Sequence, residues 1–154
     1  MSSFVVRLDA LREVGGFVAG HVNGEDADLA LRLGESPGFV QVLAPETFGY
    51  REHSGNVTHD LDKSLAGVWL QVSGERGGRY PGGATRARER WQISTRHIRP
   101  VSIGCIRRGR FADAWALYRA TFGWHLHLWR LKYLFGFPLL LVKARLFGTV
   151  QADT

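Results

Sequence analysis

Residues 24–28 place three carboxylates directly after a glycine. A carboxylate at the start of a helix can take a proton from a hydroxyl group that lies within hydrogen-bond reach. Asp26 has this position. A structural alternative is that the carboxylates of Glu25, Asp26 and Asp28 complement the helix dipole. Asp28 can also pair with Arg32 one turn later, and for Asp28 we favour this structural interpretation.

Further residues with binding chemistry lie on both sides of this cluster. Gly15 and Gly16 permit backbone conformations that a side chain forbids, so a ligand could approach closely; the same pair could simply end a helix. Arg51 could meet a phosphate, although an exposed arginine is the usual case. His53 lies two residues further on, and a solvated loop histidine is one explanation of it.

The elements that would position these residues alternate between strand and helix. Short runs of alternating or β-branched apolar residues predict strands, and acidic residues followed by good helix formers predict a helix that ends at Gly34. Strands are expected over residues 4–7, 39–43 and 48–51, and helices over residues 8–14 and 24–33.

From Leu61 onward the apolar residues recur at helical spacing, and strand signals become scarce. The polar, glycine-rich residues 73–83 are the best linker candidate. The sequence therefore predicts an α/β piece in residues 1–60 and a basic helical extension in residues 61–154. The expected apolar faces are Leu61, Leu65, Val68, Trp69 and Val72 in one helix, and Phe111, Trp115, Tyr118 and Phe122 in another.

Residues 4–56 resemble the C-terminal half of the catalytic domain of family 2 glycosyltransferases. The resemblance is carried by three motifs in order: residues 5–17 with their Gly-Gly-Phe, residues 24–33 with Glu-Asp, and residues 50–58 with Tyr-Arg-x-His. Enzymes of that family have the GT-A fold and use nucleotide-sugar donors. The resemblance implies an α/β fold class, here a partial, Rossmann-like half of a GT-A domain.

The resemblance also implies roles for the candidate residues. Asp26 would be the general base for a hydroxyl acceptor, and Glu25 would contact the acceptor or the nucleotide-sugar donor. His53 would complete the coordination of a divalent metal, Mg or Mn, that neutralises the leaving diphosphate. Such enzymes act in cell envelope polysaccharide synthesis. The remaining residues of the implied substrate site are Gly15, Gly16 and Arg51.

The donor-binding half of such an enzyme, with its Asp-x-Asp metal motif, would precede residue 4. We therefore expect a fragment, a truncated gene product or one half of a split enzyme, inactive alone.

Charge divides the chain into two unlike parts. Residues 1–75 hold 5 Lys and Arg against 11 Asp and Glu, whereas residues 76–154 hold 15 against 3. Residues 122–150 add many aromatic side chains, and their longest uncharged apolar run, residues 133–142, is about half a membrane crossing. Gly136 and Pro138 are expected to break a helix there. This composition suits an anionic membrane surface, with a buried pair of terminal helices as the alternative.

A competing function is a non-catalytic binding module that contacts phosphates of a lipid or a nucleic acid. No zinc-finger or RNA-recognition pattern is found, so nucleic acid has less support than membrane. Cys105 is the single cysteine and is expected to be a small buried residue, and no secretory signal opens the chain. We expect a cytoplasmic protein, peripheral at the inner face of the membrane. The arginines of the module would be Arg86, Arg88, Arg90, Arg96, Arg99, Arg107, Arg108 and Arg110.

Overall fold

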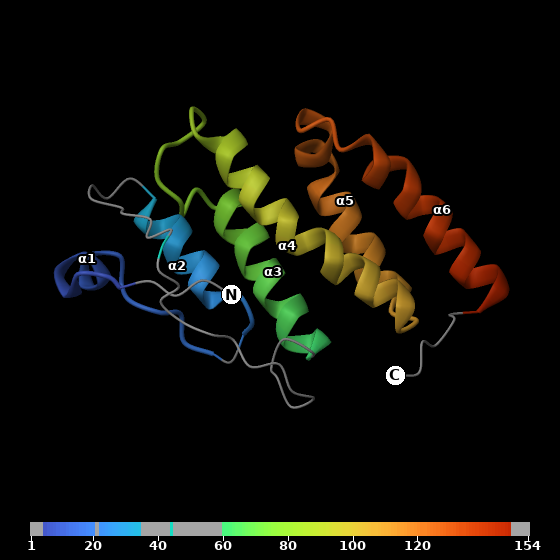
Figure 1. Ribbon diagram of the computed structural model, residues 1–154, viewed down its shortest axis with the longest axis horizontal. Helices are drawn as coiled ribbons and strands as arrows, with labels where there is room; N and C mark the ends of the chain where they lie inside the picture. The colour runs from blue at the N-terminus through green and yellow to red at the C-terminus, as the bar shows by residue number, and fades with distance from the viewer. Residues whose placement is uncertain (1–4, 21, 35–43, 45–59, 149–154) are drawn as a thin grey trace.

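The computed structural model describes residues 5–20, 22–34, 44 and 60–148, and every regular element within them is an α-helix. In Figure 1 the last four helices lie side by side, α2 lies beside them, and α1 lies at the edge. The helices are α1 (Leu8–Glu13), α2 (Glu25–Leu33), α3 (Leu61–Arg76), α4 (Ala87–Arg107), α5 (Phe111–His127) and α6 (Leu131–Phe147).

The hydrophobic core lies between α3, α4, α5 and α6. Only three residues separate α4 from α5, and a turn this short makes consecutive helices antiparallel neighbours. The rings of Tyr118 and Phe137 stack in this core, with centroids 4.6 Å apart. Cys105 is completely buried, as predicted. The buried core residues are Leu65, Val68, Val72, Ile98, Cys105, Ile106, Ala114, Leu117, Tyr118, Tyr133, Leu134, Phe137 and Leu141.

The segment before α2 is held against α3 by backbone and side-chain hydrogen bonds. The amide of Asn23 donates to the carbonyl oxygen of Lys63 over 3.1 Å, and its side-chain amide donates to the Ser64 hydroxyl over 2.8 Å. A Cβ atom at Gly67 would lie 1.7 Å from the Asn23 carbonyl oxygen, so only glycine permits this approach. The glycine in α3 therefore fixes where α2 meets the rest of the chain.

The predicted α/β class is wrong. The helices expected over residues 8–14 and 24–33 are confirmed as α1 and α2, but residues 5–7 are not a strand, and no sheet exists in the described part of the chain. The strands expected over residues 39–43 and 48–51 lie outside the described residues. An apolar run forms a strand only where a neighbouring strand can pair with it, and residues 5–7 have no such neighbour among the described segments.

The predicted linker is also not a simple linker. Its first residues, Ser73 to Arg76, complete α3, and the turn that follows carries Tyr80, which is buried. A Cβ atom at Gly74 would lie 2.7 Å from the Tyr80 hydroxyl, so the Tyr80 ring packs directly on the α3 backbone. The glycines of this segment provide room for a buried side chain. Whether residues 1–60 and 61–154 are separate domains stays a prediction.

The expectation that Gly136 and Pro138 break a helix is wrong, because α6 continues through both. A proline lacks the amide that would bond the carbonyl four residues earlier, which here belongs to Leu134. The buried Tyr118 hydroxyl of α5 donates to that carbonyl over 2.9 Å. A side chain of a neighbouring helix thus replaces the missing backbone bond.

Four helices end in the same hydrogen-bonded turn, the Schellman motif. The residue after the C-cap has a positive φ and donates its amide to the carbonyl three residues before it, and the next amide reaches the carbonyl five residues before itself. Glycine adopts a positive φ without strain, whereas other residues do so at a cost. The residues with positive φ in these turns are Gly15, Gly78, Gly109 and Trp129.

Candidate functional site

The structure describes four of the six residues predicted to carry chemistry. Gly15 and Gly16 have φ values of 81° and 71° and terminate α1, which is their structural explanation. Glu25 and Asp26 lie in the first turn of α2 and are partly buried. The Asp26 carboxylate accepts a hydrogen bond from the Ala27 amide over 2.8 Å. Arg51 and His53 lie outside the described residues, so the roles of this set stay predictions.

Asp28 takes part in a buried network that sequence reasoning found only in part. Its carboxylate accepts a 2.9 Å bond from Arg32, as predicted, and a 2.7 Å bond from the Tyr80 hydroxyl. Arg32 also donates to the Val14 carbonyl at the end of α1. Burial, followed by the hydrogen bond to Asp28, raises the pKa of Tyr80. Because hydrogen bonds occupy both oxygens of Asp28, the network joins α1, α2 and the turn after α3 rather than holding a ligand.

The implied divalent metal finds no support in the described residues. They contain no group of three or more His, Cys, Asp or Glu side chains that could hold a metal ion. Of the acidic side chains of α2, Asp26 accepts a bond from the Ala27 amide and Asp28 pairs with Arg32. His53, the ligand that the resemblance implies, lies outside the described residues, so the divalent metal stays a prediction and we derive no step through it.

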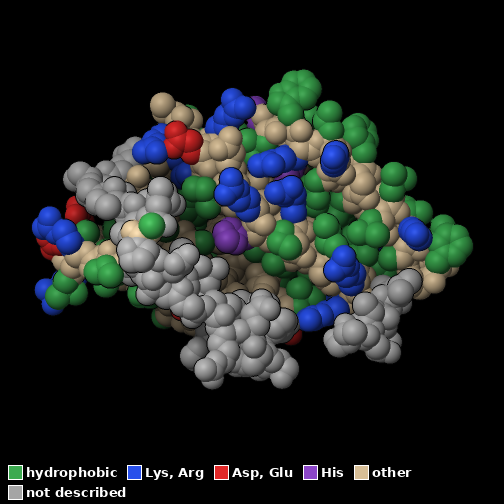
Figure 2. All heavy atoms as spheres, in the orientation of Figure 1, with side chains coloured by type: hydrophobic (Ala, Val, Ile, Leu, Met, Phe, Trp, Pro, Cys, Tyr) green, Lys and Arg blue, Asp and Glu red, His purple; other side chains and the backbone are tan. Residues whose placement is uncertain are grey.

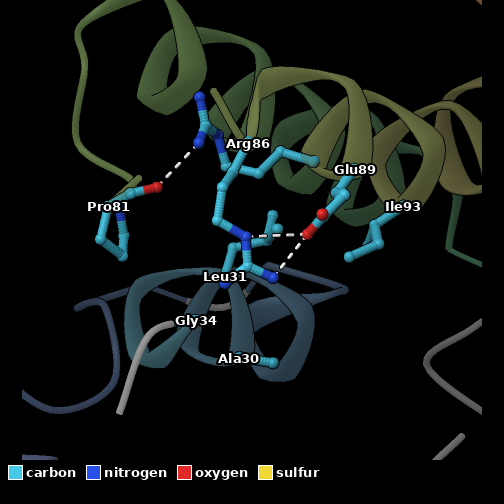
Figure 3. Close-up of a pocket in the computed structure, with 8 residues that line it drawn as sticks. Ala30, Leu31, Gly34, Pro81, Arg86, Glu89 and Ile93 are labelled. Carbon is cyan, nitrogen blue, oxygen red and sulfur yellow. Dashed lines mark hydrogen bonds and ion pairs between the residues drawn. The ribbon is translucent and has the colours of Figure 1, made fainter. Parts of the chain in front are cut away.

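A small pocket lies between α2 and α4. Its volume is about 90 Å³, well below the roughly 300–1,000 Å³ of sites that enclose a small molecule. Figure 3 shows the ion pair of Arg86 with Glu89 lying across it, and Arg90 donates a 2.7 Å bond to the Pro81 carbonyl. These groups already satisfy one another, so the pocket offers little to a ligand.

A different surface, on α6, exposes apolar side chains to solvent. On α6 five apolar side chains follow one another at helical spacing and are 44% to 72% exposed. They lie on the side of α6 that is opposite to its buried residues, such as Tyr133 and Leu141. We call this surface the α6 apolar face. It consists of Leu131, Phe135, Leu139, Val142 and Leu146.

Basic residues border the α6 apolar face. By the helical repeat, Lys132 and Lys143 lie on one border and Arg145 on the other, and all three are exposed. No Asp or Glu occurs in residues 114–152, so nothing acidic in this stretch neutralises them. Figure 2 shows hydrophobic side chains along the α6 edge, with Lys and Arg side chains between them and over α4. An apolar stripe with cationic borders is the pattern of helices that lie in a membrane interface.

Trp129 extends this surface at the turn between α5 and α6. Its φ of 53° makes it the only described residue other than glycine with a positive φ. Its side chain is 76% exposed and makes no aromatic contact with the other described residues. The indole therefore contributes little to the fold while its backbone is strained. Tryptophan has an apolar ring with a polar N–H group, and it is enriched at the boundary between water and lipid.

None of the helices in the described segments combines the length and the apolar content needed to cross a membrane. The 17 residues of α6 are about 26 Å long at 1.5 Å per residue, and lysine and arginine interrupt their apolar sequence.

Comparisons with protein-family models, with curated proteins and with solved structures gave no match. The resemblance to family 2 glycosyltransferases is therefore not supported by any family model, and the helical structure conflicts with the GT-A fold. The interpretation as a nucleotide-sugar enzyme of cell envelope polysaccharide synthesis is withdrawn with it. Short motifs misled because glycine pairs and Glu-Asp pairs also arise as ordinary helix ends and helix starts, which is how residues 15–16 and 25–26 are used here.

Sequence reasoning predicted a membrane surface for residues 122–150, which stays a prediction, but it did not separate the α6 apolar face from the buried side of the helix. The apolar residues of α6 lie on all sides of the helix, so periodicity alone cannot tell the exposed stripe from the buried one. The signal that could have found the stripe is its position between Lys132, Lys143 and Arg145.

Proposed function

We propose that this chain is a binding module that attaches to an anionic membrane surface through the α6 apolar face. The observation that carries the proposal is the exposure of five apolar side chains in a stripe bordered by Lys132, Lys143 and Arg145. The occupant that suits both features is a layer of anionic phospholipid, since its acyl chains accept the stripe and its headgroups attract the cations.

The apolar and the electrostatic contributions to the free energy of membrane binding are both large enough to matter. Complete burial of a Leu or Phe side chain contributes roughly 1.5–3 kcal/mol, and each Lys or Arg near an anionic surface contributes about 1 kcal/mol. Either term alone gives weak, reversible attachment, but together they hold a peripheral protein at the surface. The negative potential of the cytoplasmic leaflet makes the inner face of the membrane the proposed location.

Nucleic acid is the weaker alternative. It would use the arginines but would leave Phe135 and Leu139 in water, because phosphate backbones offer no apolar layer. The tests below therefore include a nucleic-acid arm.

The deciding experiment is flotation of the full chain with neutral and anionic vesicles. The double variant Phe135→Ser/Leu139→Ser is expected to lower affinity for anionic vesicles roughly 100-fold. The matched control is Leu8→Ser/Phe17→Ser, which removes one exposed Leu and one exposed Phe near α1 and should leave binding unchanged.

Two other outcomes would decide against the proposal. Equal retention by neutral and anionic vesicles, or by neither, would remove the membrane function. Salt-sensitive binding to duplex RNA or DNA that survives Phe135→Ser/Leu139→Ser, without vesicle binding, would establish the nucleic-acid alternative instead.

A further inference from the structure

Three arginines gather where α4 passes the start of α6. Arg96 and Arg99 belong to α4, and Arg130 is the N-cap residue of α6. Arg99 uses its Nε atom on the Thr95 carbonyl over 3.1 Å, and none of the three forms an ion pair with a carboxylate in the described part of the chain. By contrast Arg90 pairs with the partly buried Glu75 over 2.7 Å. The cluster therefore holds positive charge without a described counter-charge.

The three charges are close enough to act on one another. Burial, followed by the charges of Arg130 and Arg96, lowers the pKa of Arg99. Placing unneutralised like charges together in a half-buried region is unfavourable in the free protein. An anion that binds between them would remove this repulsion. Figure 2 shows Lys and Arg side chains gathered over the middle of α4.

Buried polar atoms without partners mark the same region. The Nε atom of Arg130 is buried and makes no hydrogen bond within the described residues. Both ring nitrogens of His125 are in the same condition, and His125 is completely buried. The charges of Arg99 and Arg130 act on this imidazole, and its ring centroid lies 4.2 Å from that of Tyr133. Buried N–H groups normally have acceptors, so the Nε–H of Arg130 and the single N–H of the neutral His125 ring point to a missing acceptor.

The start of α6 adds partial positive charge to that of the arginines. The first amides of a helix have no acceptor within it, and α6 has neither a side-chain cap nor an acidic residue in its first turn. Helix starts of this kind favour anions. The arginine cluster and the buried unpaired donors thus lie together with an uncapped helix start.

We propose that Arg99 and Arg130, with Arg96 beside them, bind the phosphate of a phospholipid headgroup, and that a terminal phosphate of the phosphatidic acid type is preferred. The inference rests on the proposed membrane function. Guanidinium groups bind phosphate oxygens through two parallel hydrogen bonds. A terminal phosphate presents more free oxygens and more charge than a diester, which suits several donors that converge. Arg130 directly precedes Leu131, the first residue of the α6 apolar face, so a phosphate held here would lie at the start of the stripe.

The test compares vesicles that contain phosphatidic acid with vesicles that contain the same fraction of phosphatidylglycerol. The variant Arg99→Lys/Arg130→Lys keeps the charge but removes the paired donors. It is expected to lose at least about tenfold in affinity for phosphatidic acid while its affinity for phosphatidylglycerol stays the same. Arg88→Lys/Arg107→Lys, which changes two exposed arginines of the same helix, is the matched control and should keep the preference.

A second arm uses free phosphate, so that failure of the membrane function does not hide the result. Inorganic phosphate and glycerol 3-phosphate are titrated into the full chain while the Nε–H resonances of its arginines are followed by NMR. Arg99 and Arg130 are expected to shift, and the shifts should vanish in the lysine variant.

Loss of vesicle binding together with retained phosphate shifts would contradict the proposed membrane function and identify a site for a soluble phosphate. Equal affinity of the unchanged protein for both vesicles, or phosphate titrations that leave Arg99 and Arg130 unmoved, would overturn the inference. A circular-dichroism melt of each variant shows that it is folded.

Discussion

The turn between α4 and α5 and the turn between α5 and α6 have the same backbone hydrogen bonds, but they carry opposite side-chain chemistry. In the first turn the residue with positive φ is Gly109, and the next residue, Arg110, is paired with Asp62 and Asp113. In the second turn the corresponding residues are Trp129, which is strained, and Arg130, which has no carboxylate partner in the described residues.

The buried carbonyl at the base of each turn shows the same contrast. Cys105 supplies it in the first turn, and His125 supplies it in the second. A buried cysteine is a small apolar residue, whereas the imidazole of His125 is buried without hydrogen-bond partners. The first turn is thus built for stability, and the second retains three features that weaken the fold. Strain of this kind is concentrated at functional sites in proteins, and the second turn directly precedes the α6 apolar face.

The largest expected effect concerns His125. Burial, followed by the charges of Arg99 and Arg130, lowers the pKa of His125 to about 4 from the usual 6.5. Between these pH values the unfolded chain binds more protons than the folded chain, so stability falls as pH drops. Urea unfolding should show a loss of about 2 kcal/mol between pH 7 and pH 5 that disappears in His125→Leu. The same pH dependence in His125→Leu would assign it to other groups.

The second effect tests the strain in the turns directly. Gly109→Trp places tryptophan at the position of the first turn that corresponds to Trp129 in the second. No atom lies within 4 Å of a Cβ built at Gly109, so only the backbone conformation opposes the substitution. We expect a loss of about 1–2 kcal/mol in urea unfolding and no gain in vesicle binding. A neutral substitution would show that this turn holds a side chain without strain.

The third and smaller effect concerns the two arginines. Arg110→Gln removes the pairs with Asp62 and Asp113 and is expected to lower the melting temperature slightly. Arg130→Gln removes no described ion pair, so it should leave the melting temperature unchanged or raise it while it weakens attachment to anionic vesicles. The reverse pattern would mean that Arg130, and not Arg110, stabilises its turn.

The sequence predicts those features of the structure that depend on local contacts, and it misses those that depend on distant residues. The helices α1 and α2, the pair of Asp28 with Arg32 and the burial of Cys105 depend on neighbours in the sequence or on residue type, and all were predicted. The continuity of α6 depends on the Tyr118 hydroxyl, which comes from another helix, and it was missed. The α/β class failed because a strand depends on a partner that no local pattern supplies.

The candidate surface was only half predictable for a similar reason. Aromatic and basic composition indicated a membrane surface, but which apolar residues stay exposed depends on how α6 packs against α4 and α5. The strain at Trp129 has no sequence signal, because the Schellman motif is recognised by its glycine and this turn has none.

The smallest expected effect on stability, and the sharpest test of the comparison, is Trp129→Gly. Glycine relieves the strain of a positive φ, but it also gives the unfolded chain more freedom, and these two terms nearly cancel. The lost side chain is 76% exposed, so little packing is removed. The free energy of unfolding should therefore change by no more than about 0.5 kcal/mol, while affinity for anionic vesicles falls several-fold because an interfacial indole is lost. Large destabilisation would show that the indole supports the fold, and unchanged vesicle affinity would leave the strain at Trp129 unrelated to the membrane.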